Sequence, residues 1–295
     1  ARAAVDRALE VYTRENNPKI WAETQTLLGR VLLMIGAHGN AQALKDARAA
    51  VDRALEVYTR ENNPEEWAYT QTLLGSVLWA MGAHGNAQAL KDARAAVNRA
   101  LEVYTRENNP EMWAYTQTLL GWVLLEFGRR GHGQALWDAR AAVDRALEVY
   151  TRENNPEMWA RTQILLGWVL LELDMRGYNL VSDGDVIVLA LEYARAAVNR
   201  ALEVFTRENN PEMWAQTQVT LGRVLLAIGM GWGGQALEDA RAAFDRALEV
   251  FTRENNPEMW AETQTRLGWV LWAMGAHGNA RALRDARAAV NRALE

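Results

Sequence analysis

The stretch TRENNPEMWA at residues 105–114 decides the architecture, because it returns almost unchanged along the whole chain. Close copies of it begin at Thr13, Thr59, Thr151, Thr206 and Thr252. In each copy a proline follows two asparagines. Proline cannot continue the helix before it, whereas asparagine and proline are favoured at the N-cap and the first position of a new helix. The motif therefore predicts the end of one helix and the start of the next, six times over.

The segment upstream of the motif also repeats, which predicts a tandem array. Successive copies of ARAAVDRALE start 46 residues apart, except for 55 residues between Ala139 and Ala194. A helix pair of this length is typical of stacked helical repeats, so we expect a single repeat domain over residues 1–295. The predicted repeats are 1–46, 47–92, 93–138, 139–193, 194–239 and 240–285, followed by a terminal helix at 286–295.

Each repeat divides into two helices, here called A and B. In the first repeat, helix A is predicted from Pro18 to Gly36 and helix B over residues 41–61, each preceded by an asparagine cap. The predicted buried stripe of helix A is Trp21, Gln25, Leu28, Leu32 and Ile35. The predicted apolar face of helix B is Ala43, Ala47, Ala50, Val51, Ala54, Leu55 and Tyr58. Small residues on one helix against large ones on the other predict a close antiparallel pair.

The pattern W-A-x-T-Q-x-x-L-G-x-x-L, followed by regularly spaced alanines, resembles a long tetratricopeptide repeat. In the third repeat the matching residues are Trp113, Leu120, Gly121, Leu124, Ala139, Ala142, Ala146, Leu147 and Pro156. The resemblance covers nearly the whole chain and implies an all-α, right-handed superhelical solenoid. It also implies that the A helices line a concave groove, and it leaves the bound partner undetermined.

Comparison of the repeats with one another singles out one face of helix A. Helix B hardly changes between copies, including at its exposed charged positions, whereas six positions of helix A vary and fall opposite the predicted buried stripe. Several of these positions become Trp or Tyr, residues that are typical of interaction surfaces. The predicted groove residues are Tyr69, Trp79, Tyr115, Trp122, Glu126, Arg161, Ile164, Trp168, Glu172, Arg223, Trp269 and Trp272. The alternative is a varied surface that binds nothing.

The charges in the predicted groove favour a peptide or protein segment as the partner. Arginines and glutamates are both present there, and the whole chain carries a formal net charge of -5. A nucleic-acid reader needs a positive field along the phosphate backbone, so we expect no nucleic-acid partner and no membrane partner. Cysteine is absent, which fits a reducing compartment, and we expect a cytoplasmic location.

The longer fourth repeat contains GYNLVSDGDVIVLALEY from Gly177 to Tyr193. Its two β-prone runs flank a polar turn, which predicts a small β-hairpin at about 178–188. An extension of helix B from Val186 onward is the alternative.

Residues that would indicate an enzyme are missing from the sequence. The four histidines fall in separate A–B loops without metal-ligand spacing, and no glycine-rich phosphate loop follows a strand. We therefore expect no catalytic activity, no metal and no cofactor.

The sequence as a whole predicts a non-catalytic scaffold that binds a peptide or protein in a groove. The near-identity of the copies indicates a designed or consensus-derived protein. Two alternatives stay open: a ligand-sensing or adaptor region of a larger bacterial signalling protein, and a structural array that associates with itself end to end.

Overall fold

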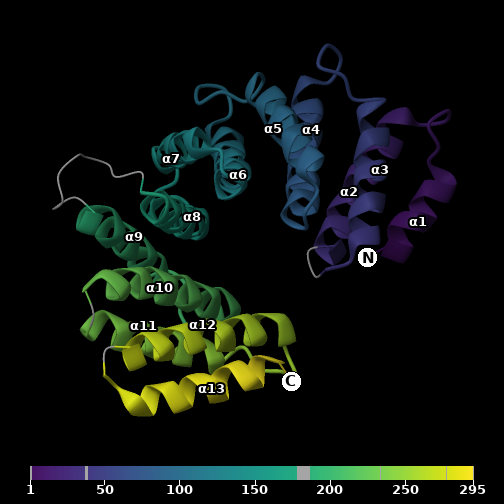
Figure 1. Cartoon of the computed structure of the whole chain (residues 1–295). Coiled ribbons are helices and arrows are strands. Elements are labelled where there is room, and N and C mark those ends of the chain that lie inside the picture. Colours follow the sequence, from purple (N-terminus) through teal and green to yellow (C-terminus); the bar gives the residue numbers. More distant parts are fainter. Residues whose placement is uncertain (1, 37–38, 178–186, 233, 277, 295) are drawn as a thin grey trace. The chain divides into compact units, whose positions relative to one another are not determined.

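The computed structural model describes residues 2–36, 39–177, 187–232, 234–276 and 278–294. All regular secondary structure in this part of the chain is α-helical, in thirteen helices (Figure 1). The chain divides into two compact units, Ala1–Val149 and Tyr150–Glu295. Each unit is described by itself.

The first unit holds three A–B pairs and one additional B-type helix. Helices α2 and α3, α4 and α5, and α6 and α7 form the pairs, and α1 packs against α2. The bounds are α1 (Arg2–Val11), α2 (Pro18–Gly36), α3 (Ala41–Leu55), α4 (Pro64–Ala83), α5 (Ala87–Leu101), α6 (Pro110–Arg129) and α7 (Gly133–Leu147).

The second unit holds the other three pairs, α8 with α9, α10 with α11, and α12 with α13. The bounds are α8 (Pro156–Met175), α9 (Ile187–Leu202), α10 (Pro211–Trp232), α11 (Gln235–Leu248), α12 (Pro257–Ala276) and α13 (Ala280–Leu294). Residues 286–294 of the predicted terminal helix form the second part of α13. The all-α repeat fold is confirmed, with consecutive helices paired throughout both units.

The A helices begin where the sequence predicts, at the proline of each copy of the motif. In α6 the N-cap is Asn109, whose Oδ1 accepts a hydrogen bond of 3.2 Å from the backbone N–H of Met112. The equivalent bond to Asn155 measures 3.1 Å. These bonds satisfy one of the backbone donors that a helix start leaves without a partner.

The B helices end earlier than predicted. Helix α5 ends at Leu101, although the pattern predicted helix as far as the TRE of the motif. The backbone N–H of Thr105 donates to Oδ1 of Asn108 at 2.8 Å, and the backbone N–H of Asn108 donates to Oγ1 of Thr105 at 3.2 Å. The Asn108 amide also donates to the Val103 carbonyl at 2.7 Å. Threonine and asparagine thus supply partners that a further helical turn would otherwise provide.

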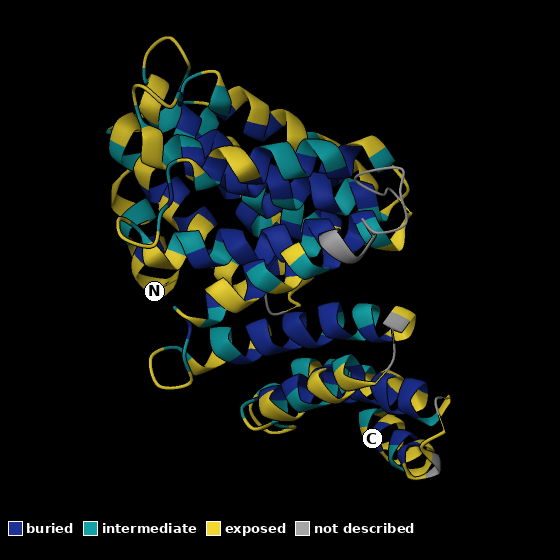
Figure 2. Cartoon of the chain, turned by 90° about the vertical axis from the view of Figure 1, so that its left-hand side faces the viewer, coloured by how far each residue is buried: buried dark blue, intermediate teal, exposed yellow. Residues whose placement is uncertain are grey.

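Close packing within each pair depends on small residues. Ala47, Ala50 and Val51 of α3 are completely buried. A Cβ atom on Gly29 of α2 would collide with the Val51 side chain, and one on Gly36 would collide with Leu44. Figure 2 shows buried residues along the inner sides of the helices and exposed residues on their outer sides and in the turns. The two helices of a pair can therefore approach only because these positions lack a side chain.

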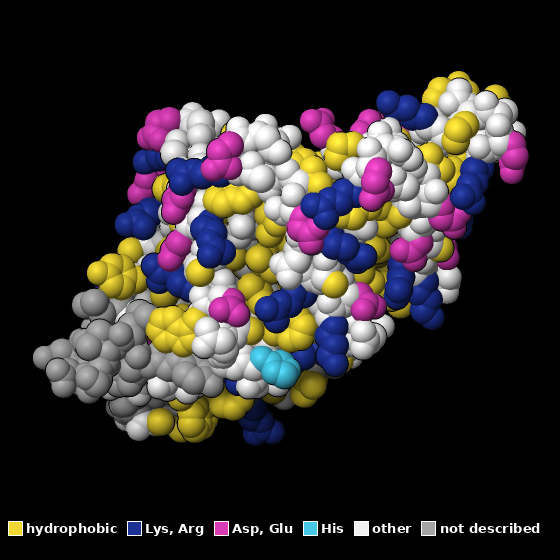
Figure 3. Space-filling model, turned by 90° about the horizontal axis from the view of Figure 1, so that it is seen from above, with side chains coloured by type: hydrophobic (Ala, Val, Ile, Leu, Met, Phe, Trp, Pro, Cys, Tyr) yellow, Lys and Arg dark blue, Asp and Glu magenta, His cyan; other side chains and the backbone are white. Residues whose placement is uncertain are grey.

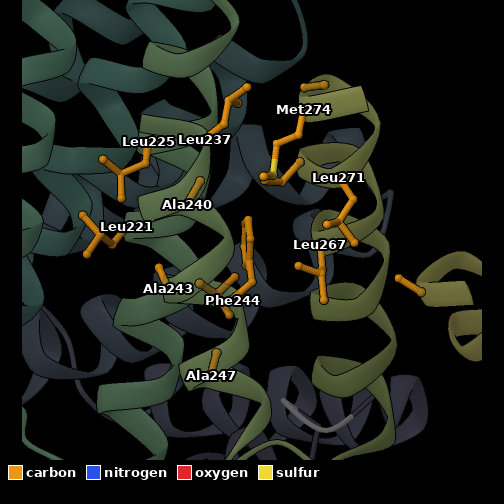
Figure 4. Packing of buried hydrophobic residues seen from close by; sticks show 14 of the residues in the cluster. Leu221, Leu225, Leu237, Ala240, Ala243, Phe244, Ala247, Leu267, Leu271 and Met274 are labelled. Atoms are coloured by element: carbon orange, nitrogen blue, oxygen red, sulfur yellow. The ribbon is translucent and has the colours of Figure 1, made fainter. Parts of the chain in front are cut away.

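The apolar core of the second unit shows the same arrangement with a larger residue. Phe244 of α11 stands where the other B helices have valine, and its ring packs directly on Gly222 of α10. Leu221 and Leu225 come from α10, and Leu267 of α12 belongs to the same core cluster (Figure 4). Residues from α9 through α13 thus share one core cluster, which joins consecutive repeats.

The fourth repeat departs from the others at both edges of its insertion. Asp174 occupies the position of Gly36 and its glycine counterparts at the end of helix A. Helix α9 begins at Ile187, one residue earlier than the position equivalent to Ala41. The hairpin predicted at about 178–188 falls mainly on residues 178–186, which lie outside the described residues.

Candidate functional site

The variable residues of the A helices, hereafter the A face, lie on α4 and α6 in the first unit. Tyr69 and Trp79 belong to α4, and Tyr115 and Trp122 to α6. Tyr115 is 40% exposed, whereas the other three are half-buried. The rings of Trp79 and Trp122 are 5.8 Å apart between centroids and tilted by 48°, which is a favourable aromatic pair. The two tryptophans thus join neighbouring repeats and keep part of their surface open.

Glu126 closes the A face of the first unit at the end of α6. Its carboxylate lies 3.7 Å from Arg129 and 3.4 Å from Arg130. Arg130 also donates a hydrogen bond of 2.6 Å to the carbonyl oxygen of Gly82, at the end of α4. Glu126 therefore belongs to a network that ties the ends of α4 and α6 together.

In the second unit an arginine covers a tryptophan of the preceding repeat. The guanidinium of Arg223 on α10 lies 4.0 Å from the ring centroid of Trp168 on α8. The same arginine lies 3.9 Å from the carboxylate of Glu262 on α12, which in turn lies 3.5 Å from Arg266. Three consecutive A helices are connected through this sequence of contacts.

Three further predicted residues of the second unit are engaged within the protein. Arg161 lies 2.9 Å from the carboxylate of Glu157 and 6.0 Å from the ring of Phe205. Ile164 and Glu172 are only 6% and 8% exposed. Both are therefore beneath the surface, where we had expected them to line a groove, and Ile164 belongs to a core cluster against which Trp214 of α10 packs.

The largest aromatic exposure on the A face is at the end of the second unit. Trp269 and Trp272 of α12 are 56% and 50% exposed. Their rings meet edge to face, with centroids 5.9 Å apart. Their repeat positions match those of Trp168 and Trp79, which are half-buried where another A helix follows.

The unvarying charges of helix B have structural partners. Arg106, in one copy of the motif, lies 2.6 Å from Glu148, the residue that caps the end of α7. Equivalent pairs join Arg14 to Glu56, Arg60 to Glu102, Arg152 to Glu203 and Arg207 to Glu249. The constancy of these positions is explained by packing between repeats, so it does not by itself favour binding at the positions that vary.

Two clefts lie among mostly constant residues of the first unit, which sequence comparison had not singled out. The larger, of about 400 Å³, lies at the turn after α5 and is bordered by Trp113, Arg106 and Arg145. The smaller, of about 160 Å³, has Leu120 and Leu124 in its lining and shares Arg145. No residue of the A face lines either cleft, within the described residues. A repeat comparison overlooks them because most of their residues do not change.

The charges on the surface are mixed in sign. In the view of Figure 3, Lys and Arg side chains alternate with Asp and Glu across the described surface, with hydrophobic side chains between them. Among the described residues, no group of three or more His, Cys, Asp or Glu could hold a metal ion. None of the helices in the described part is long and apolar enough to cross a membrane.

Comparison with known proteins adds little to this description. No protein family and no curated protein matches the sequence. Among solved structures, one similar chain is described as a circular tandem repeat protein with novel repeat topology and enhanced subunit contact surfaces. It is 19% identical over 99% of this chain and 74% of that chain, with a TM-score of 0.31. This similarity is too low to carry an argument about fold or function.

Proposed function

We propose that this chain is a non-catalytic repeat scaffold that binds an extended peptide or protein segment on the A face. The observation that carries the proposal is the exposure of large aromatic residues along one side of the A helices, with Tyr115 in the first unit and Trp269 and Trp272 in the second. Aromatic side chains lose little conformational entropy on binding and offer large contact areas, so they are enriched where proteins meet.

The neighbouring charges support a peptide over a polyanion. Glu126 and Glu262 each lie beside two arginines on the A face, so charges of both signs are interspersed there, and the chain as a whole carries a formal net charge of -5. A peptide backbone and its mixed side chains can add hydrogen bonds to such groups, whereas a polyphosphate needs a positive field along its whole path. The role of a scaffold also agrees with the contacts that Trp79, Trp122 and Trp168 make between adjacent A helices.

The proposal is tested by selecting peptides from a random library on the 1–295 protein and measuring their affinity for variants. Tyr115→Ala should weaken peptides that bind the first unit at least about tenfold, and Trp272→Ala should do the same to peptides that bind the second unit. Tyr193→Ala is the matched control, because Tyr193 is an aromatic residue with similarly high exposure, 55%, on the B helix α9. It should leave affinity unchanged, and circular dichroism should show the same helicity for all three variants.

Two results would contradict the proposal. One is a library that yields no peptide binding above background. The other is a set of peptides whose affinity falls for Tyr193→Ala but not for Tyr115→Ala or Trp272→Ala, since this would place the binding surface on the B helices.

A further inference from the structure

The last helix pair, α12 and α13, exposes apolar residues that are buried wherever another repeat follows. Leu283 and Val290 of α13 are 46% and 40% exposed, whereas their equivalents in α5, Leu90 and Val97, are 1% and 0% exposed. Together with Gly268, Trp269 and Trp272 of α12, these residues form what we call the C face. The C face has the composition of an internal junction without its second half.

The first A helix, α2, carries that second half. Leu27 and Met34 are 46% and 72% exposed. Their equivalents in α4, Leu73 and Ala80, are both 8% exposed, because the preceding repeat covers them. With Arg30, which lies between them on the same helix and is also exposed, Leu27 and Met34 form what we call the N face.

Internal junctions show how the two faces would fit. The Leu73 side chain lies 3.5 Å from the place that a Cβ atom would take on Gly29, and Leu119 lies 3.4 Å from that place on Gly75. At Gly268 the three nearest atoms all belong to α13, so no leucine of a following repeat occupies the space. Leu27 occupies the repeat position of Leu73 and Leu119, and so has the right side chain for this space.

The polar contacts would fit as well. Trp168 and Arg223 occupy one repeat position in consecutive repeats and stack at 4.0 Å. Trp269 and Arg30 occupy this same position in the last and first repeats. Arg30 placed over Trp269 would therefore reproduce a cation–π contact that the protein already makes.

Helix α1 now occupies part of the place on α2 that a preceding repeat would fill. Residues 1–10 are repeated at 286–295 with one difference, Asp6 against Asn291. Val5 of α1 is buried, and Val290 of α13 is its counterpart. Helix α13 thus offers the side chain that α1 uses and adds Leu283 and the whole of α12. A complete helix pair covers more apolar area than α1 alone, which favours exchange.

From these matches we infer that the 1–295 protein associates head to tail, with α12 and α13 of one copy packing on α2 of a second copy and displacing its α1. The two faces differ, so the interface is heterologous. Each added copy leaves one N face and one C face open, and assembly continues into rings or filaments. This inference does not depend on the proposed peptide binding, but both use Trp269 and Trp272, so a peptide bound at these residues would compete with association.

Sedimentation of the 1–295 protein over a range of concentrations tests the inference. The average mass should rise with concentration. Leu27→Glu and Val290→Glu should each weaken association at least about tenfold, because each places a carboxylate in an apolar contact. Met230→Glu is the matched control, since Met230 is 63% exposed on α10 and belongs to neither face, and it should associate like the unmodified protein.

A mixture of the two variants distinguishes a heterologous from a two-fold symmetric interface. Leu27→Glu keeps an intact C face and Val290→Glu an intact N face, so an equimolar mixture should form dimers containing one copy of each and stop there. Val5→Asp, which loosens α1, should strengthen association severalfold.

Three results would overturn the inference. A monomer mass that does not change with concentration would remove self-association. A mixture of the two variants that stays monomeric would remove the pairing of these faces. If Val5→Asp left the association unchanged or weakened it, the displacement of α1 would be ruled out.

Discussion

Arg223 of α10 lies with its guanidinium 4.0 Å above the ring of Trp168 on α8. Both residues belong to the positions that vary between repeats, and both contribute to the contact between consecutive A helices. The variable residues therefore have a role within the protein, in addition to any role toward a partner. A cation over an aromatic ring in a partly desolvated contact stabilises by about 0.5–2 kcal/mol.

Removing this contact should destabilise the second unit. Arg223→Met keeps the length of the side chain and removes its charge, so we expect the free energy of unfolding to fall by about 1 kcal/mol. Urea denaturation of Arg223→Met, Trp168→Leu and the double variant forms a cycle whose coupling should be about 0.5–1 kcal/mol. Arg207→Met is the control, because Arg207 is 53% exposed and 5.9 Å from Trp214. If the coupling energy between Arg207 and Trp214 equalled that between Arg223 and Trp168, the close stacking of Arg223 would have no particular effect on stability.

The buried glutamines of the A helices give a matched pair of variants. Oε1 of Gln25 accepts a hydrogen bond of 3.2 Å from Arg53, whereas Oε1 of Gln117 is buried without a hydrogen-bond partner. Replacing an unsatisfied buried polar group by an apolar one of similar size can be neutral or stabilising, whereas removing a satisfied one costs about 0.5–1.5 kcal/mol.

We therefore expect Gln117→Leu to leave the stability unchanged or raise it, and Gln25→Leu to lower it. The midpoint of urea unfolding, measured for both variants and the unmodified protein, tests this difference. A larger loss for Gln117→Leu than for Gln25→Leu would show that the oxygen of Gln117 has a partner in solution.

Asp174 should destabilise the helix pair that it closes. It stands where other repeats have glycine, its Oδ1 is buried without a hydrogen-bond partner, and burial raises the pKa of its carboxyl group. A negative charge in the last turn of a helix also opposes the helix dipole. Asp174→Asn removes the charge at almost constant volume and should raise the stability by about 1 kcal/mol at neutral pH.

The stability difference between Asp174→Asn and the unmodified protein should depend on pH. Because the pKa of Asp174 is higher in the folded protein, the folded state binds the proton more tightly than the unfolded chain. The stability contributed by the protonated form is complete below the unfolded pKa and is lost as the pH rises through the folded value. The advantage of Asp174→Asn should therefore shrink on acidification, and an advantage that grows as the pH falls would contradict this assignment.

Sequence alone predicted the A helices well because their limits are set locally. Asn109 fixes the start of α6 by accepting a hydrogen bond from the backbone N–H three residues later, and Pro110 does so through its restricted backbone angle. Both residues are visible in the motif. The end of α5 was missed because Thr105 and Asn108 bond to each other, an alternative to helix that hydrophobic periodicity does not contain.

The A face was harder to predict because it depends on neighbouring repeats. Helical periodicity places Ile164 around the axis of α8, opposite the stripe of buried residues, but it does not say where the next A helix packs. Thr72 of α4 occupies the repeat position of Ile164. Its Oγ1 lies 3.3 Å from Oγ1 of Thr116 on the next A helix, α6, so this side of the A helix faces a neighbour. The exposure of Trp269 and Trp272 has the same origin, since α12 has no further A helix beside it among the described residues.

Alkaline pH should weaken the first unit through Tyr104. This tyrosine, in the turn that follows α5, is 4% exposed, and its hydroxyl donates a hydrogen bond of 3.1 Å to the carbonyl oxygen of Glu65 at the start of α4. Burial is the main cause that raises the pKa of Tyr104 to about 12, with a smaller effect of the nearby Glu65 carboxylate. Since the unfolded value is about 10, the folded state retains its proton where the unfolded chain loses it. The contribution of the neutral phenol is therefore complete below about pH 10 and is lost as the pH rises toward 12.

Tyr104→Phe separates this titration from other alkaline effects. At neutral pH the variant should be less stable by about 0.5–1.5 kcal/mol, because it lacks one buried hydrogen bond. Between about pH 10 and 12 the unmodified protein should lose stability faster than the variant, so that the difference between them closes and then reverses in sign. Phe205 and Phe251 occupy the equivalent positions of two later repeats and are equally buried, which indicates that the site accepts phenylalanine without repacking. Tyr115→Phe, which changes an exposed phenol on α6, is the control and should lose stability at alkaline pH as the unmodified protein does. If the stability of Tyr104→Phe and of the unmodified protein fell in parallel with pH, Tyr104 would not be the source of the loss.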